Sequence, residues 1–288
     1  MILATINSGG AEVAAIVLPK GAVPIEYVNA ALGRDWPTDL FALLEAGRLR
    51  DLQVWLRSLN EAEFDKLAGH AIPMGCISPR PLYRGPRKIW GIGLNYAEHA
   101  GDLDETAPAA EPASFMRPDT TIIGPGEEIR LPKQSERVTG EAELAVIIGC
   151  RAKEVSVEEA PSVVAGFTTV LDMTAEDILR RNPRYLTRSK SFDTFFSFGP
   201  HLMTPDEIED VNSLEVATVL NGEVRRTNTI SNMTFSPWEL VAFHSEIMTL
   251  LPGDIISTGT PGAVRLTGGD LLECRISGFM TLSNPVGG

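Results

Sequence analysis

The 288-residue sequence predicts an α+β protein that is mainly β, with a small α+β module ahead of a larger domain. Many short apolar runs separated by turn residues follow Lys88, among them TTIIGP, AELAVIIG and GDIISTGTPG, and such runs are typical of strands. Helical patterns are fewer and do not alternate regularly with the strands, which argues against repeated βαβ units. We expect the module at residues 1–80 and the larger domain at residues 81–288.

The leading module combines a strand hairpin with helices. MILATI and EVAAIVLP read as two strands joined by Ser8-Gly9-Gly10. From residue 37 to residue 69, apolar residues recur at helical spacing, with Gly47 as an expected interruption. The proline-rich stretch from residue 73 to residue 87 is expected to be an extended connector.

The larger domain is expected to begin with the strand KIWGIGLNY, followed by an acidic, proline-rich loop, DLDETAPAAEPASF, that could cover a site. Asn221-Gly222 between two apolar runs predicts a hairpin. Helices are expected in VEEAPSVV, AEDILRR and SPWELVAFHSEIMTLL. The last of these carries an apolar stripe, Leu240, Phe243, Ile247 and Leu250, which we interpret as core, with His244 as a structural residue.

The composition limits the classes of binding partner and the cellular location that we expect. The formal net charge of −13 argues against nucleic acid and anionic membrane surfaces. There is no run of about 18 apolar residues, so no membrane span is expected, and the N-terminus does not resemble a signal peptide. The three cysteines are far apart and form no CxxC pair. A reducing cytoplasm is the simplest location.

Two glutamates interrupt an otherwise apolar strand, GEAELAVIIG at residues 140–149. Side chains alternate along a strand, so Glu141 and Glu143 share one face with Ala145. Either solvent covers that face, or a cation bridges the two carboxylates. A second apolar strand, GFTTVLDMT, ends in Asp172. Three carboxylates without Cys or His favour a hard divalent ion, Mg²⁺ first and Mn²⁺ or Ca²⁺ next.

A lysine in RSKSFDTFFSFGP fits the same chemistry. Lys190 on its own reads as a surface residue, but beside a metal site it could neutralise a substrate oxyanion. The histidine of GLNYAEHA, His99, reads on its own as a structural residue that caps a turn.

An ordered set of motifs then resembles the fumarylacetoacetate hydrolase family in its bacterial form, over about residues 88–286. The set is GLNYAEHA, FMRP, GEAELAVIIG, DMT, KSFDTFFSFGP, NGE, PGDIISTGTP and ISGFMTLSNPV. The resemblance implies a mixed β-sandwich or β-roll catalytic domain, a homodimer, and 2-oxo acid substrates, often 2,4-dioxo acids. It implies metal ligands at Glu141, Glu143 and Asp172, and His99 paired with Asp102 as a catalytic dyad. Lys190 is implied as catalytic and substrate-binding, with Tyr96, Gly259 and Thr260 also at the substrate.

Three positions depart from the family's usual pattern. Asp102 stands where a glutamate is usual, and Glu176 and Leu179 stand where an arginine and a glutamine usually grip the substrate. An acid in place of the arginine should weaken binding of small dianions such as oxaloacetate, unless Arg180, Arg181, Arg184 or Arg188 compensates.

The expected function is metal-dependent hydrolysis of a C–C bond in a 2,4-dioxo acid. Lys190 and the ion would stabilise an enolate, and His99, oriented by Asp102, would take a proton from water. Three alternatives remain: a 2-oxo acid decarboxylase, a 2-hydroxy-dienoate isomerase, and a non-catalytic metal-binding scaffold.

Overall fold

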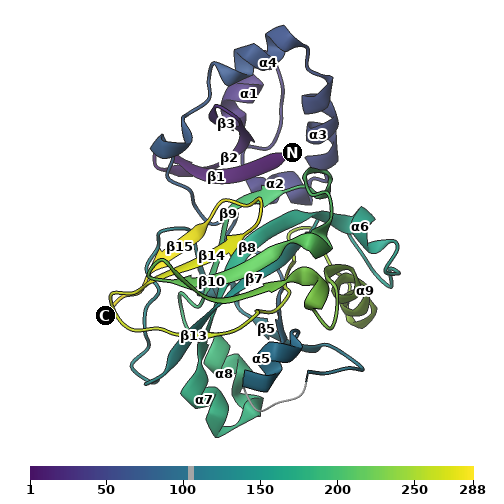
Figure 1. Ribbon diagram of the computed structural model, residues 1–288. Helices are drawn as coiled ribbons and strands as arrows, with labels where there is room; N and C mark the ends of the chain where they lie inside the picture. Colours follow the sequence, from purple (N-terminus) through teal and green to yellow (C-terminus); the bar gives the residue numbers. More distant parts are fainter. Residues whose placement is uncertain (103–106) are drawn as a thin grey trace.

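The computed structural model describes residues 1–102 and 107–288, except for the side chains of His99, Ala100 and Asp102. Its architecture is mainly β, as predicted (Figure 1). Within the described residues, most strands join one mixed eleven-stranded sheet, and four others form an antiparallel sheet. No helix in that part of the chain is both long and apolar enough to span a bilayer.

The larger sheet follows the order β3-β2-β1-β9-β8-β7-β12-β4-β5, with β13 beside β7 and β6 beside β9. Its strands are β1 (Ile2–Ser8), β2 (Ala11–Leu18), β3 (Gly21–Pro24), β4 (Ile89–Gly93), β5 (Ala113–Arg117), β6 (Ile122–Ile123), β7 (Val138–Ile148), β8 (Val164–Ala175), β9 (Phe196–Met203), β12 (Ile255–Ser257) and β13 (Val264–Arg265). The smaller sheet contains β10 (Glu215–Leu220), β11 (Glu223–Thr229), β14 (Leu271–Ile276) and β15 (Leu282–Pro285). The helices are α1 (Ile25–Leu32), α2 (Leu40–Glu45), α3 (Leu49–Ser58), α4 (Glu61–Ala68), α5 (Ala97–Asp102), α6 (Ala160–Val163), α7 (Glu176–Arg181), α8 (Leu186–Lys190) and α9 (Pro237–Ile247).

The N-terminal residues extend the large sheet and add helices above it (Figure 1). β1 and β2 form the predicted hairpin, with Gly9 and Gly10 at positive φ in the turn. Gly47 lies between α2 and α3 as expected, with a φ of 65°, a conformation that glycine adopts without strain. β1 also pairs with β9, so the same sheet runs from the N-terminal strands to the centre of the molecule.

The central strands β7 and β8 are buried along their whole length. Their apolar residues divide between two cores, as strand alternation predicts. Leu144 and Val146 join the core that includes the small sheet. Ala145 and Ile147, on the face of the two glutamates, join the core that contains the N-terminal helices. The N-terminal helices therefore cover the part of this β7 face that carries Ala145 and Ile147. The part that carries Glu141 and Glu143 lies beyond these two residues and is a candidate site.

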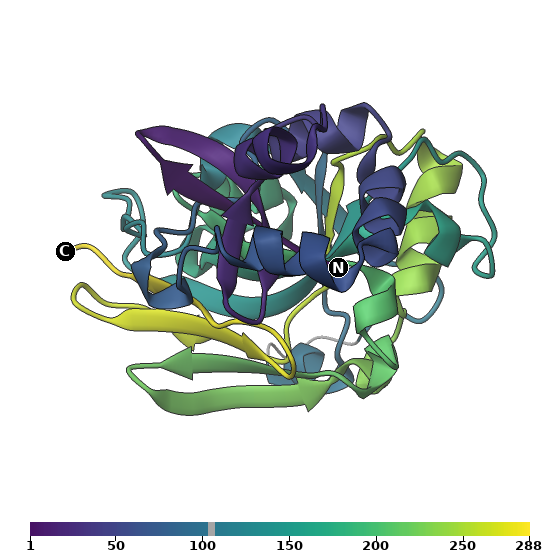
Figure 2. The same ribbon diagram turned by 90° about the horizontal axis from the view of Figure 1, so that it is seen from above.

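The small sheet forms a separate layer, visible in Figure 2 as the green and yellow strands. Its hairpin β10–β11 turns at Asn221-Gly222, where both residues have positive φ, as the sequence predicts. β10 packs against β7, and the hydroxyl of Thr218 accepts a hydrogen bond from the backbone N–H of Ala142 at 3.1 Å.

Two helix predictions need correction. The helix expected in VEEAPSVV is only the four-residue α6, because the chain enters β8 at Val164. α9 ends at Ile247, which is 52% exposed, so Ile247 is not core. Leu250 is buried but lies beyond the helix, in an isolated bridge to Ala152. Leu240 and the structural His244 are buried in the helix as expected.

Candidate metal and substrate site

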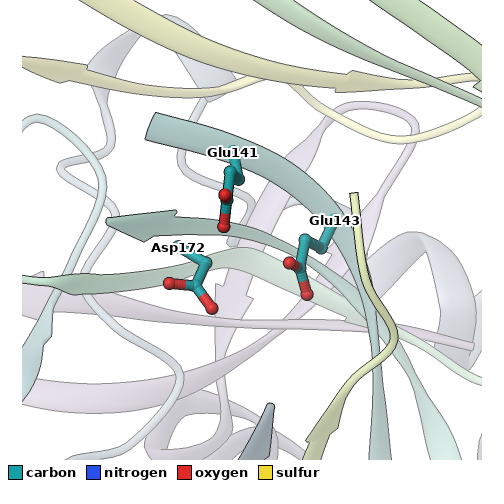
Figure 3. Close-up of side chains that lie close together, drawn as sticks. All are labelled: Glu141, Glu143 and Asp172. Atoms are coloured by element: carbon teal, nitrogen blue, oxygen red, sulfur yellow. The ribbon is translucent and has the colours of Figure 1, made fainter. Parts of the chain in front are cut away.

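Strand register brings the three acidic residues together. Glu141 of β7 lies directly opposite Asp172 of β8, and Glu143 is two residues further along the same face of β7. All three are buried, and each offers a carboxylate oxygen within 4.8 Å of the others. Figure 3 shows the three side chains converging from the two strands. Of the two interpretations of this face, the solvent-covered one is wrong.

Two cations contact the acidic cluster. The ammonium of Lys190 donates to Glu141 Oε2 at 2.7 Å and to Asp172 Oδ1 at 2.9 Å. The guanidinium of Arg117, which is fully buried, donates to the same Asp172 oxygen at 2.5 Å. Burial lowers the pKa of Lys190, but the charges of Asp172 and Glu141 outweigh it, so the pKa lies above its usual value. Lys190 is therefore a charged member of the site, not a surface residue.

Arg117 also fixes the segment that carries Lys190. Its guanidinium donates to the carbonyl oxygens of Lys190 and Phe195, at 2.8 and 2.9 Å. One side chain thus ties the end of α8 and the start of β9 to a metal-ligand candidate. The motif FMRP contains this arginine, but the sequence analysis assigned it no role. The signal that could have found it is charge balance, because three buried carboxylates need more than one cation.

Glu143 is held by groups at the end of β12 and in the turn after it. Its Oε2 accepts hydrogen bonds from Ser257 Oγ at 2.5 Å and from the backbone N–H of Gly259 at 2.9 Å. Burial raises the pKa of this carboxyl to about 8; the charges of Asp172 and Glu141 add to the effect, while Lys190 and the Ser257 hydrogen bond oppose it. Burial thus favours the neutral form of this carboxyl, whereas a further cation at the site would favour its charged form.

The donor set fits a hard divalent cation. Arg117 and Lys190 pair with Asp172 and Glu141, and the third carboxylate, Glu143, has no cationic side chain as a partner in the described chain. In each carboxylate one oxygen accepts the hydrogen bonds described above, and within the described chain the other oxygen has no hydrogen-bond partner. All-oxygen ligation suits Mg²⁺, Mn²⁺ or Ca²⁺ rather than a thiolate-seeking metal.

The predicted substrate residues lie on segments around the same cluster. Tyr96 is fully buried, its hydroxyl has no hydrogen-bond partner within the described chain, and burial and then the charge of Glu143 raise its pKa. Gly259 has a φ of 99°, and a Cβ there would lie 2.9 Å from Asn95, so the turn requires glycine. Thr260 is buried, and its hydroxyl bonds the backbone of Gly262 in the same turn.

The predicted dyad can be placed only by its backbone. His99 and Asp102 belong to α5, which follows β4 and the turn that contains Tyr96. Their side chains lie outside the described residues, and so does the first part of the acidic loop. The catalytic role of both residues stays a prediction.

Glu176 is buried and neutralised by neighbours. Its carboxylate pairs with Arg137, and with Arg180 one helical turn further along α7 at 2.5 Å. Arg181 pairs with Asp177 instead. The acid at the position where family members usually carry arginine is therefore not a bare negative charge facing the site. One of its two arginine partners, Arg137, was not singled out by the sequence analysis.

Comparison with known proteins places these residues in a family context. Residues 88–287 match the family model described as fumarylacetoacetate (FAA) hydrolase, C-terminal. An uncharacterized protein of Pyrococcus abyssi is 43% identical over 205 residues, which are 70% of this chain and 90% of that protein. Human mitochondrial oxaloacetate tautomerase FAHD2B is 37% identical over 210 residues, covering 70% of this chain and 67% of the human protein. Maleylpyruvate hydrolase from Sphingobium sp. SYK-6, solved with manganese(II) and pyruvate, matches with a TM-score of 0.79 and 27% identity over 100% of both chains.

Proposed function

From its membership of the fumarylacetoacetate hydrolase family, to which this chain belongs, we propose that the protein is a divalent-metal-dependent hydrolase of 2,4-dioxo acids. The observation that carries the proposal is the set of three converging carboxylates with the Lys190 ammonium at 2.7 and 2.9 Å from two of them. The full-length similarity to a maleylpyruvate hydrolase solved with manganese(II) and pyruvate supports this choice of reaction.

In the proposed reaction, water adds to the distal carbonyl and the C–C bond breaks to give pyruvate and a second carboxylic acid. A divalent ion held by Glu141, Glu143 and Asp172 would supply positive charge beside the 1-carboxylate and 2-oxo group. Lys190 places its ammonium where negative charge develops on the enolate. His99, oriented by Asp102, takes the proton from the attacking water. Tyr96, Gly259 and Thr260 line the substrate.

The proposal also covers the native metal ion, the oligomeric state, the cellular location and the division into domains. We propose Mg²⁺ as the native ion, with Mn²⁺ or Ca²⁺ as substitutes, because the ligands are all oxygen. We further propose a cytoplasmic homodimer that acts in catabolism, with residues 1–80 as the leading module and residues 81–288 as the catalytic domain. The N-terminal helices share one core with the apolar end of β7, which supports a stabilising role for the module.

A second candidate is tautomerisation of oxaloacetate, and the 37% identity to a human oxaloacetate tautomerase favours it. This reaction moves a proton between carbon and oxygen and needs no attacking water. The pairing of Glu176 with Arg137 and Arg180 removes one objection to a small dianionic substrate at this site.

Turnover of chelator-stripped protein separates the candidates. Acetylpyruvate, fumarylpyruvate and oxaloacetate are offered with Mg²⁺, with Mn²⁺ or without metal, and the products are identified by mass. Pyruvate plus a second acid supports the hydrolase. Loss of enol absorbance without a change of mass supports the tautomerase, and release of CO₂ supports the decarboxylase. The absence of turnover under every metal would overturn the enzyme proposal.

Glu143→Gln sharpens this assay. The amide oxygen can still accept the hydrogen bonds from Ser257 and Gly259, so the fold should persist while the ligand charge is lost. We expect Mn²⁺ affinity, measured by calorimetry, to fall by about 100-fold or more, and turnover to fall with it. Glu209→Gln, a change at an exposed glutamate, is the matched control and should leave both unchanged. Unchanged Mn²⁺ affinity in Glu143→Gln would contradict the ligand assignment.

A further inference from the structure

A hollow of about 490 Å³, which we call the arginine pocket, has a wall of four arginines and three apolar residues. The arginines are Arg137, Arg225, Arg226 and Arg265, and the apolar residues are Leu220, Ala263 and Val264. Within the described chain no acidic residue belongs to this wall. Acidic residues outnumber basic ones by 38 to 25 in the whole sequence, so the wall reverses the charge of the average surface. A hollow of this volume lies in the range of small-molecule sites, about 300–1,000 Å³.

Three separate segments bring the arginines together. Arg137 directly precedes β7, Arg225 and Arg226 lie on β11, and Arg265 lies on β13. β13 pairs with the start of β7, and β10, the partner of β11, packs against β7 (Figure 1). The stem of Arg226 lies over Gly262, where a Cβ would come within 2.5 Å of its Cδ, so a glycine there leaves room for the arginine. Like charges that the fold draws together repel one another, and an anion placed among them relieves that repulsion.

The acidic partners of these arginines balance their charge only in part. Arg137 pairs with Glu176, a carboxylate that it shares with a further arginine of α7. Arg225 pairs with Glu223 at 3.0 Å, and the two side chains are 49% and 70% exposed, so water weakens the pair. Arg265 is exposed and forms no ion pair within the described chain. The guanidinium of Arg265 is therefore open to an external anion, and Arg225 loses little when it contacts the same anion.

The arginine pocket is distinct from the acidic cluster. No residue of its wall belongs to the cluster or to the two cations of the cluster, Arg117 and Lys190. Arg137 and Glu141 are four residues apart in the sequence, which corresponds to about 13 Å along a strand. A ligand of the pocket therefore needs no contact with the metal-ligand candidates, and the pocket is a second site.

The wall favours a phosphate group over a carboxylate. A guanidinium offers two parallel N–H donors that match phosphate oxygens, and a phosphate ester presents three acceptor oxygens and nearly two negative charges. A carboxylate has two oxygens and one charge, so it satisfies fewer arginines of such a wall. The half-buried side chains of Leu220 and Ala263 add an apolar surface beside the guanidinium groups. This combination suits a small organic phosphate whose apolar part lies against those two residues.

We propose that the arginine pocket binds a phosphate group, either as inorganic phosphate or in a small phosphate monoester. The inference goes beyond the proposed function and does not depend on it. The two ligands share the charged group, and the apolar residues of the wall favour the monoester. Because Arg265 has no acidic partner within the described chain, we expect it to contribute most to the binding of the phosphate group.

Calorimetry of the full-length, Mg²⁺-loaded protein tests this proposal with two probes at constant ionic strength, inorganic phosphate and phenyl phosphate. Both should bind, and phenyl phosphate should bind about threefold more tightly or better, because its ring meets the apolar residues. Arg265→Leu should weaken the binding of both probes about tenfold, the usual effect of losing a charged hydrogen bond. Arg265→Lys keeps the charge but loses the fork, so its affinity should lie between the two. Arg151→Leu, at an exposed arginine outside the pocket, is the matched control and should leave both affinities unchanged.

Glu143→Gln locates the bound phosphate. This variant alters the acidic cluster and leaves the wall of the pocket intact, so the affinity for phosphate should not change. Loss of phosphate binding in Glu143→Gln would place the anion at the metal and overturn the pocket assignment, while the proposed function would stand. Equal losses in Arg265→Leu and Arg151→Leu would mean attraction to surface charge in general and would also overturn it. Failure of both probes to bind at about 10 mM would do the same. Tighter binding of phenyl phosphate identifies a monoester as the ligand, and equal affinities identify inorganic phosphate.

Discussion

The acidic cluster and the arginine pocket, a hollow whose lining includes Arg137, Arg225, Arg226 and Arg265, arrange their charges in opposite ways. In the cluster, Arg117, Asp172 and Lys190 are almost completely buried, with side-chain exposures of 0%, 1% and 7%. In the pocket, Arg225 remains 49% exposed even though it has a partner. Water screens the second set and not the first. The buried charges should therefore depend strongly on one another, while each exposed charge should depend only weakly on its partner.

Breaking the buried network should have the largest effect. Arg117→Leu leaves Asp172 without one of its two cations and removes the donor to the Lys190 and Phe195 carbonyls. We expect the free energy of unfolding to fall by about 3–5 kcal/mol, the usual cost of removing one partner of a buried ion pair. Guanidinium chloride unfolding at pH 7 without added metal measures this change.

The matched control for Arg117→Leu is an arginine in an exposed pair. Arg275 pairs with Glu273 and is 45% exposed, so Arg275→Leu should cost less than about 1 kcal/mol. Similar losses in the two variants would mean that burial does not decide the cost of losing an arginine from an ion pair, and the comparison of buried with exposed charges would fail.

A buried ionisable group far from both regions gives the next largest effect. His201 of β9 is 1% exposed, and neither ring nitrogen has a hydrogen-bond partner among the described residues. Burial lowers its pKa from 6.5 to about 4. Between these values the unfolded chain binds a proton that the folded protein does not. The free energy of unfolding should thus fall by about 3 kcal/mol as the pH drops from about 6.5 to about 4.

His201→Phe isolates this contribution. The ring packs against Phe279 at 5.3 Å, so an aromatic replacement keeps the shape of the site. Unfolding measured at several pH values between 7 and 4 should show a weaker loss of stability in this variant. His70→Phe, at an exposed histidine, should keep the full pH dependence. An identical pH profile for His201→Phe and the unaltered protein would exclude His201 as the cause.

The sequence predicted the parts of the site that depend on local pattern. Alternation in GEAELAVIIG correctly placed Glu141 and Glu143 on one face of a strand. The single acidic residue of the second apolar strand, Asp172, was correctly grouped with them as a third carboxylate. The hairpins at Gly9-Gly10 and Asn221-Gly222 followed from turn chemistry. Each of these features is encoded within a few residues of chain, which is the range over which patterns can be read.

Long-range partners could not be predicted in this way. Arg117 reaches Asp172 from a strand 55 residues away, and Arg137 reaches Glu176 across 39 residues. Nothing next to either arginine in the sequence marks its partner, because only the pairing of strands brings them together. The substitution of Glu176 for the usual arginine therefore read as a loss of positive charge, whereas the structure supplies compensating guanidinium groups.

The smallest expected effect concerns that compensation. Arg180 is 61% exposed and pairs with Glu176 at helical i,i+4 spacing, so Arg180→Ala should lower the free energy of unfolding by only about 0.5 kcal/mol. Glu176 keeps Arg137, and because the two arginines are 40% and 61% exposed, water screens both pairs and the loss of one should be tolerated. Chemical denaturation of Arg180→Ala, Arg137→Ala and the double variant measures the coupling. A loss above about 2 kcal/mol for Arg180→Ala alone would place Glu176 with the buried network around Asp172, since only desolvated charges depend so strongly on a single partner.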